Sequence, residues 1–199
     1  MMKIKRLCSL ILCCIVVLGI CSESQAVMLR KGKLSDANYP VKERPANRPV
    51  LPKTGDIAVV VEGADPHHTA IAEAIIIEEL INNGYRVVDE AKMKKIRAAA
   101  ARAKAARYAL EGNVEGILKI NGSYNAAATI VADVRAGLPE RNEFKLYTGT
   151  ASAAIIAVTS NGTKLGGRTA QGKAVGYTVS EARENALTSA IKEGMALIF

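Results

Sequence analysis

The chain has 199 residues, 49% hydrophobic and 4% aromatic, with a formal net charge of +8. This length fits one ordinary domain with additional segments and excludes two large domains. All four cysteines (Cys8, Cys13, Cys14 and Cys21) lie near the start, so the remainder has no thiol for a disulfide or a Cys-based metal site. Tryptophan is absent and the tyrosines are scattered, which argues against base stacking, so we expect no nucleic-acid partner.

Residues 1–26 have the pattern of a secretory signal. Basic residues precede an uncharged, apolar run over 7–22, and Ser24-Gln25-Ala26 places small residues before a cleavage point at Val27. The run is shorter than the ~20 apolar residues of a membrane-spanning helix, although an uncleaved anchor is the alternative. We therefore expect export to the periplasm or cell envelope, with every cysteine removed on cleavage.

Residues 27–53 are predicted to form a basic, proline-rich linker. Four of the six prolines fall there, and its seven basic residues outnumber its two acidic ones. Residues 54–199 carry 17 basic and 16 acidic side chains, so the high charge belongs to the leader and linker. The linker is either a solvated tether or an arm that contacts anionic lipid or cell-wall polymer.

The domain is predicted to begin with a strand, a helix and a second strand. Residues 56–61 form an apolar run typical of a strand buried on both faces. Isoleucines and leucines recur at helical spacing over 69–83, and Gly84 stands where a helix ends. A short strand at 85–88 completes a βαβ unit.

An alanine-rich helix is predicted over 91–110, with Asp89 as its N-cap. It contains the concentrated basic feature of the domain, a candidate interaction face. That face is either a docking site for an acidic partner or anionic surface, or a solvated helix surface paired with nearby acids. Its members are Lys92, Lys94, Lys95, Arg97, Arg102, Lys104 and Arg107.

The second half is predicted to be mainly β-structure closed by a helix. A short helix at 114–120 and a turn at Asn121-Gly122 lead to a strand at 126–135 and a polar loop at 138–142. Long strands at 144–159 and 164–177 form a hairpin whose Asn161-Gly162 favours a type I′ turn. The last helix starts at a capping box of Thr178 and Glu181.

These elements predict an α/β fold over 54–199. The expected layered domain has a mixed sheet of about five strands, including a long antiparallel hairpin, and three main helices.

Two patterns in the sequence have some of the residues of a chemical site. Asp65, His67 and His68 follow the first strand, where α/β folds often bind ligands, and a hydrolase or metal-dependent enzyme would have to use them. No third His or Cys completes a metal shell, and no Ser elbow accompanies them. Gly172-Lys173 imitates the end of a phosphate-binding loop, but Ala174 supplies no hydroxyl. We expect no catalytic residue, cofactor or metal.

Several segments resemble the bacterial envelope family of the curli secretion component CsgG, with its relatives the TolB amino-terminal domain and flagellar-assembly and cell-wall-activator lipoproteins. The resemblance lies in the strand at 57–61, the Gly-aromatic-x-Val-Val-acid step at 84–89, the strand at 124–132 and the closing segment at 172–191. It implies a periplasmic, non-catalytic assembly or docking module and transfers no catalytic residue.

The leading functional hypothesis is therefore an exported, non-catalytic envelope protein. It would act as an interaction or assembly module in a secretion, surface-appendage or cell-wall complex, binding other envelope proteins or itself. The alternative is a binder of anionic polymer or lipid through the basic linker and helix.

Overall fold

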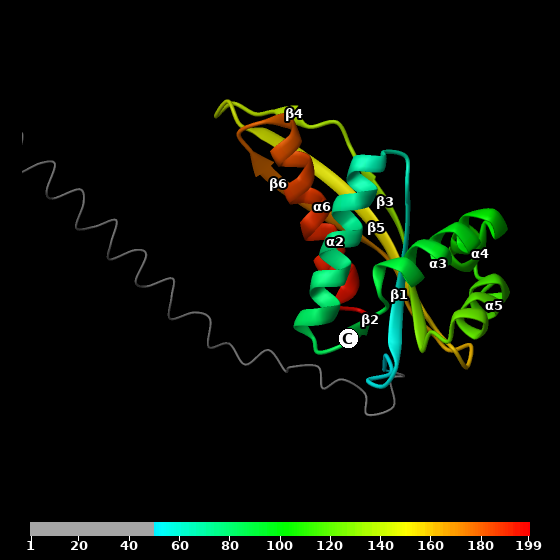
Figure 1. The fold of residues 1–199 in the computed structure, drawn as a ribbon. Coiled ribbons are helices and arrows are strands. Elements are labelled where there is room, and N and C mark those ends of the chain that lie inside the picture. Colours follow the sequence, from blue (N-terminus) through cyan, green and yellow to red (C-terminus); the bar gives the residue numbers. More distant parts are fainter. Residues whose placement is uncertain (1–49) are drawn as a thin grey trace, which may run out of the picture. The chain divides into compact units, whose positions relative to one another are not determined.

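The computed structural model describes residues 50–199, so the predicted signal and most of the predicted linker lie outside the described residues. Between residues 50 and 199 there are six strands and five helices (Figure 1). They are β1 (Asp56–Gly63), α2 (Pro66–Asn82), β2 (Arg86–Val87), α3 (Glu90–Ala103), α4 (Ala105–Leu110), α5 (Glu115–Tyr124), β3 (Ala128–Ala136), β4 (Glu140–Arg141), β5 (Tyr147–Thr159), β6 (Lys164–Gly176) and α6 (Val179–Met195). None of these helices is long and apolar enough to cross a membrane.

The strands form one mixed sheet, as the sequence predicted. β1 is parallel to β2 and β3, β5 is antiparallel to β3, and β6 is antiparallel to β5. The short β4 pairs with β5 at Thr148, beyond the point where β3 ends opposite Ala151. Because Val175 of β6 also pairs with Thr148, β4 must lie on the β3 side of β5. The sequence assigned β4 to a loop.

Helices cover the two faces of the sheet unequally. α6 packs on β5 and β6, and α2 packs on β1 beside α6 (Figure 1). On the opposite face, α3, α4 and α5 cover one end of the sheet, over β1, β3 and the end of β5. Among residues 50–199 no helix covers the far half of that face, and Thr150, Gln171 and Lys173 are exposed there.

Three glycines allow α6 to rest directly on the β5–β6 hairpin. A Cβ added at Gly149 would lie 2.2 Å from the carbonyl oxygen of Ala182, and one at Gly172 would lie 1.9 Å from that of Ala186. At Gly176 it would lie 2.5 Å from the amide nitrogen of Ala182. The phosphate-loop imitation around Gly172 is therefore a strand segment whose glycine relieves crowding.

The chain is already anchored to the domain before β1 begins. Leu51 is buried in the core. Lys53 donates from Nζ to the carbonyl oxygen of Asn83 at 2.8 Å and lies 3.9 Å from the ring centre of Tyr85. That ring stacks on Phe199 with centroids 5.4 Å apart, so the segment before β1 packs at the same place as the end of the chain.

The two predicted N-caps and the glycine predicted to end the first helix are confirmed, whereas that helix already begins at Pro66 and the helix predicted over 114–120 continues to Tyr124. Gly84 adopts φ 76° after α2, and Asp89 accepts a hydrogen bond from the amide of Lys92 at 2.9 Å. The hydroxyl of Thr178 accepts from the amide of Glu181 at 3.1 Å, and the carboxylate of Glu181 accepts from the amide of Tyr177 at 2.8 Å. Short polar side chains at these positions satisfy amides that have no partner within the helix.

Three local predictions are wrong. The helix over 91–110 breaks at Lys104, whose φ of 48° separates α3 from α4 and turns Ala105 into the core. Asn121 is not in a turn but lies buried within α5. The β5–β6 hairpin does not use a type I′ turn, because Gly162 has a positive φ and Asn161 does not. The amide of Gly162 donates to the carbonyl of Thr159 at 3.0 Å, a tight turn closed by a left-handed glycine.

Candidate functional site

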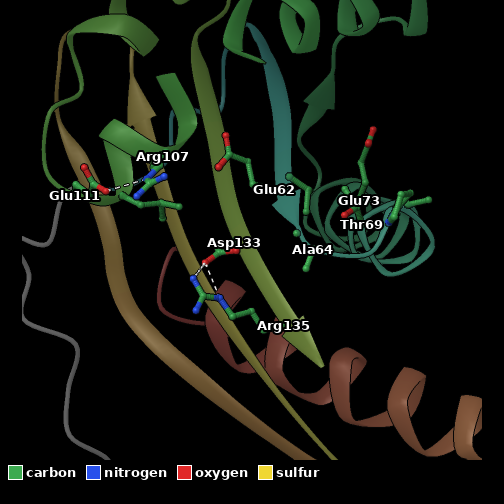
Figure 2. Close-up of a pocket in the computed structure, with 13 residues that line it drawn as sticks. Glu62, Ala64, Thr69, Glu73, Arg107, Glu111, Asp133 and Arg135 are labelled. Atoms are coloured by element: carbon green, nitrogen blue, oxygen red, sulfur yellow. Dashed lines mark hydrogen bonds and ion pairs between the residues drawn. The ribbon is translucent and has the colours of Figure 1, made fainter. Parts of the chain in front are cut away.

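A groove of about 1100 Å³ lies at the carboxyl ends of the parallel strands β1 and β3 (Figure 2). The first turn of α2 and the end of α4 form its walls, with Thr69 on one side and Leu110 on the other. Ligands commonly bind outside the carboxyl ends of strands in α/β sheets. The groove therefore lies where a ligand would be expected in an α/β fold.

The groove is mixed in charge with an acidic excess. Glu62 and Asp133 are neighbours across β1 and β3. Arg135 donates from Nη2 and Nε to Oδ2 of Asp133 at 2.9 and 3.2 Å (Figure 2). On the α4 side, Nε of Arg107 donates to Oε1 of Glu111 at 3.2 Å. In the described part of the chain, no cation pairs with Glu62.

Arg97, a member of the predicted basic face, is an internal link between helices. Its guanidinium pairs with Glu73 of α2 and lies 3.3 Å from Oε1 of Glu90. Its Nε is buried and has no hydrogen-bond partner among residues 50–199, and burial lowers the pKa of the guanidinium. Arg97 therefore holds α3 against α2. Its partner Glu73 also lines the groove.

The other six basic residues divide into two groups. Arg107 pairs with Glu111, and Nζ of Lys92 lies 3.9 Å from Asp56. The remaining four are exposed and make no ion pair with the residues at 50–199; they are Lys94, Lys95, Arg102 and Lys104. The break at Lys104 also turns α4 away from the direction of α3, so the seven cations do not form one continuous helix face. An interaction through the four exposed cations stays a prediction.

Asp65, His67 and His68 form the start of α2. Asp65 is the N-cap and accepts from the amide of His67 at 2.9 Å, the main cause that lowers the pKa of its carboxyl. Nδ1 of His68 lies 3.2 Å from Oδ2 of Asp65, whereas Nε2 of His67 lies 3.7 Å from Oε1 of Glu184 in α6. The two imidazoles thus face different carboxylates. Across residues 50–199 no group of three or more His, Cys, Asp or Glu side chains is placed to hold a metal ion.

An exposed apolar tip was missed in the sequence. Five large apolar side chains are 40% to 81% exposed at the end of the sheet where β5 begins and β6 ends; they are Leu138, Phe144, Val175, Tyr177 and Val179. Leu138 and Phe144 lie on either side of β4, which pairs with the first part of β5, and the other three lie in or just after the end of β6, which pairs with the same part of β5. Soluble proteins rarely expose large apolar patches without a binding role. Leu138 stood in a predicted loop, but the other four stood in or beside predicted strands and the last helix, where large apolar residues are ordinary, so the sequence carried little signal of their exposure.

Comparison with known proteins gives no family. No family model matches the chain, and no curated protein matches it. Among solved structures, a PelC dodecamer from Paraburkholderia phytofirmans has a TM-score of 0.45 at 16% identity, covering 75% of this chain and 93% of that one. Lipoprotein GNA1162 from Neisseria meningitidis has a TM-score of 0.41 at 18% identity, covering 72% and 99%. Similarity at this level does not assign the chain to a family.

Proposed function

We propose that this chain is an exported, non-catalytic protein of the bacterial envelope that works by binding other envelope proteins. Export is supported by the signal pattern at 1–26. We also propose kinship with the CsgG and TolB amino-terminal group, on the segments that resemble it. The process served would be secretion, surface-appendage assembly or cell-wall assembly.

The apolar tip is the observation that carries the proposal. Leu138 is 81% exposed, Phe144 75% and Tyr177 79%. Each side chain is large and mainly apolar, so its burial would be favourable in free energy. Burial of such side chains against a partner releases water from apolar surface, and exposed clusters of this kind mark interaction sites. Aromatic residues are also over-represented among the residues that dominate binding energy.

A binding role is further supported by how the polar groups are used. His67 and His68 each face a carboxylate of a different element, so they do not converge on one reacting atom. In the groove, Arg135 and Arg107 are already bonded to Asp133 and Glu111. These pairs supply a polar surface for recognition.

Charging the tip is expected to abolish partner capture. The double variant Leu138→Glu/Phe144→Glu should lower recovery of cross-linked envelope partners by about tenfold or more, because carboxylates resist transfer into an apolar interface. The measurement is crosslinking of the tagged full chain in intact cells, followed by purification and mass spectrometry.

Ile81→Glu is the matched control. Ile81 is also an exposed apolar residue, 58% exposed, but it lies near the C-terminus of α2 and outside the apolar tip. Equal recovery with the tip variant and the parent would contradict the proposal. A parent that is monomeric and captures no partner would contradict it too.

Binding of anionic lipid or polymer is the second candidate, favoured by the unpaired cations of α3. Replacement of Lys94, Lys95 and Arg102 by glutamate should remove binding to phosphatidylglycerol vesicles, and parental binding should weaken as salt rises. Vesicle sedimentation at two salt concentrations measures both effects. Binding that is absent, or unchanged by salt, would dismiss this candidate.

A further inference from the structure

Strand β6 has a free edge. It pairs with β5 along most of its length, and no strand among residues 50–199 pairs with its other side. The face of the sheet beside this edge is the uncovered one, where Gln171 and Lys173 are exposed. On that face an incoming strand would meet neither a helix nor a neighbouring strand of residues 50–199, whereas α6 covers the other face of β6.

The backbone groups that point outward can be identified from the pairing. The amide of Gly137 donates to the carbonyl oxygen of Thr150 at 2.8 Å, so the backbone of Thr150 faces β3 and not β6. In antiparallel sheets bonded and non-bonded pairs alternate, and Lys173 pairs with Thr150. Lys173, Gln171 and Thr169 therefore direct their amides and carbonyls to the free edge.

At both ends of this edge, regular pairing with a further strand is interrupted. The amide side chain of Asn185 in α6 donates to the outward carbonyl of Val175 at 3.0 Å, which agrees with the alternation. At the other end, the register shifts opposite Ile155, and Gly166 and Gly167 adopt φ of 76° and 104°. Such a bulge interrupts regular pairing. The available template is the short segment from Thr169 to Lys173.

The charge of β6 indicates what the edge can accept. The strand contains Lys164, Arg168 and Lys173 but no acidic residue, and these cations make no ion pair with residues 50–199. Pairing with a second β6 would align the cations of two copies along one seam, whereas an acidic strand would neutralise them. The same edge leads directly into the apolar tip at Val175 and Tyr177.

We propose that β6 docks an extended acidic segment of a partner protein, which adds to the sheet as a further strand. Its backbone would pair with the segment from Thr169 to Lys173, a carboxylate would lie beside Lys173, and an apolar residue would reach Tyr177. The inference rests on the proposed binding function and specifies the chemistry of the partner.

The test uses a short fluorescent peptide that alternates valine and glutamate, with a valine–lysine peptide for comparison. Gln171→Pro removes an outward amide and should weaken binding of the acidic peptide by about tenfold or more, while the fold persists because proline is tolerated at sheet edges. Gln171→Thr keeps the amide and should bind like the parent. Lys173→Glu should reverse the preference in favour of the lysine peptide. Fluorescence anisotropy measures binding, and thermal melts check folding.

Hydrogen exchange supplies a second readout, in which the acidic peptide should slow exchange at the amides of Gln171 and Lys173. Absence of binding, or equal binding to Gln171→Pro, would overturn the inference. So would a parental dimer dispersed by Gln171→Pro, since the occupant would then be a second copy. If parent and Gln171→Pro capture the same envelope protein, edge docking fails while the proposed function stands. If the acidic peptide binds β6 but the protein captures no envelope protein, the peptide-binding edge stands and the proposed function fails.

Discussion

Replacing Gly172 with valine is expected to destabilise the folded protein severely. A Cβ at this position would lie 1.9 Å from the carbonyl oxygen of Ala186 and 2.6 Å from the amide nitrogen of Ala190. Both atoms belong to the backbone of α6, so no rotamer change relieves the clash. The helix would have to withdraw from β6 and expose Leu187 and Ile191, which are fully buried. We expect a loss of more than about 4 kcal/mol in the free energy of unfolding, a large part of the usual total.

Urea unfolding followed by circular dichroism measures this loss. Gly122→Ala is the matched control, because Gly122 lies in α5 with no atom within 4 Å of an added Cβ. That variant should be as stable as the parent, or more stable by up to about 1 kcal/mol, since alanine favours helices. A Gly172→Val protein with parental stability would mean that α6 does not contact β6 through this glycine.

Replacing Asn121 with alanine is expected to lower the free energy of unfolding by about 1–3 kcal/mol. Asn121 is 1% exposed, and its amide group donates to the carbonyl oxygen of Val158 at 3.0 Å. Its Oδ1 accepts from the hydroxyl of Thr129 at 2.6 Å. The variant leaves that buried hydroxyl without its acceptor, and the polar contact between α5 and the sheet is lost. Chemical denaturation of parent and variant measures the difference.

A double-mutant cycle separates the hydrogen bond from packing. Asn121→Leu alone leaves the hydroxyl of Thr129 without its acceptor, and Thr129→Val alone leaves the amide oxygen of Asn121 without its donor. The double variant Asn121→Leu/Thr129→Val removes both partners of this hydrogen bond. The double variant should be less destabilised than the sum of the two single changes, because neither partner of the hydrogen bond between Asn121 and Thr129 is left buried without the other. Strict additivity would show that the two side chains are not coupled.

Features encoded by a few neighbouring residues could be predicted from the sequence. The N-caps Asp89 and Thr178 and the glycine after α2 depend on local backbone chemistry, so their patterns were sufficient. The break at Lys104 depends on distant packing instead. Ala105 packs so closely against Gly116 of α5 that a Cβ added to this glycine would lie 2.9 Å from the Cβ of Ala105. Helical periodicity across 91–110 contains no information about that contact.

The candidate sites were less predictable for the same reason. The basic set is a run of positive charges along one segment of the sequence, but the acid that binds Arg97 comes from α2. The apolar tip draws Leu138 and Tyr177 from segments that meet only when β4 and β6 flank β5. The outward direction of the β6 amides follows from register, which a single sequence does not specify.

The glycine seating of α6 also has a mechanical consequence. At Gly149, Gly172 and Gly176 no side chain separates the helix from the hairpin. If α6 slid or tilted, its backbone would clash sterically with the backbone of β5 and β6. The hairpin and its helix should consequently move as a single stiff lever. A force applied where the apolar residues meet a partner would be carried along the whole length of that lever rather than absorbed near the point of contact.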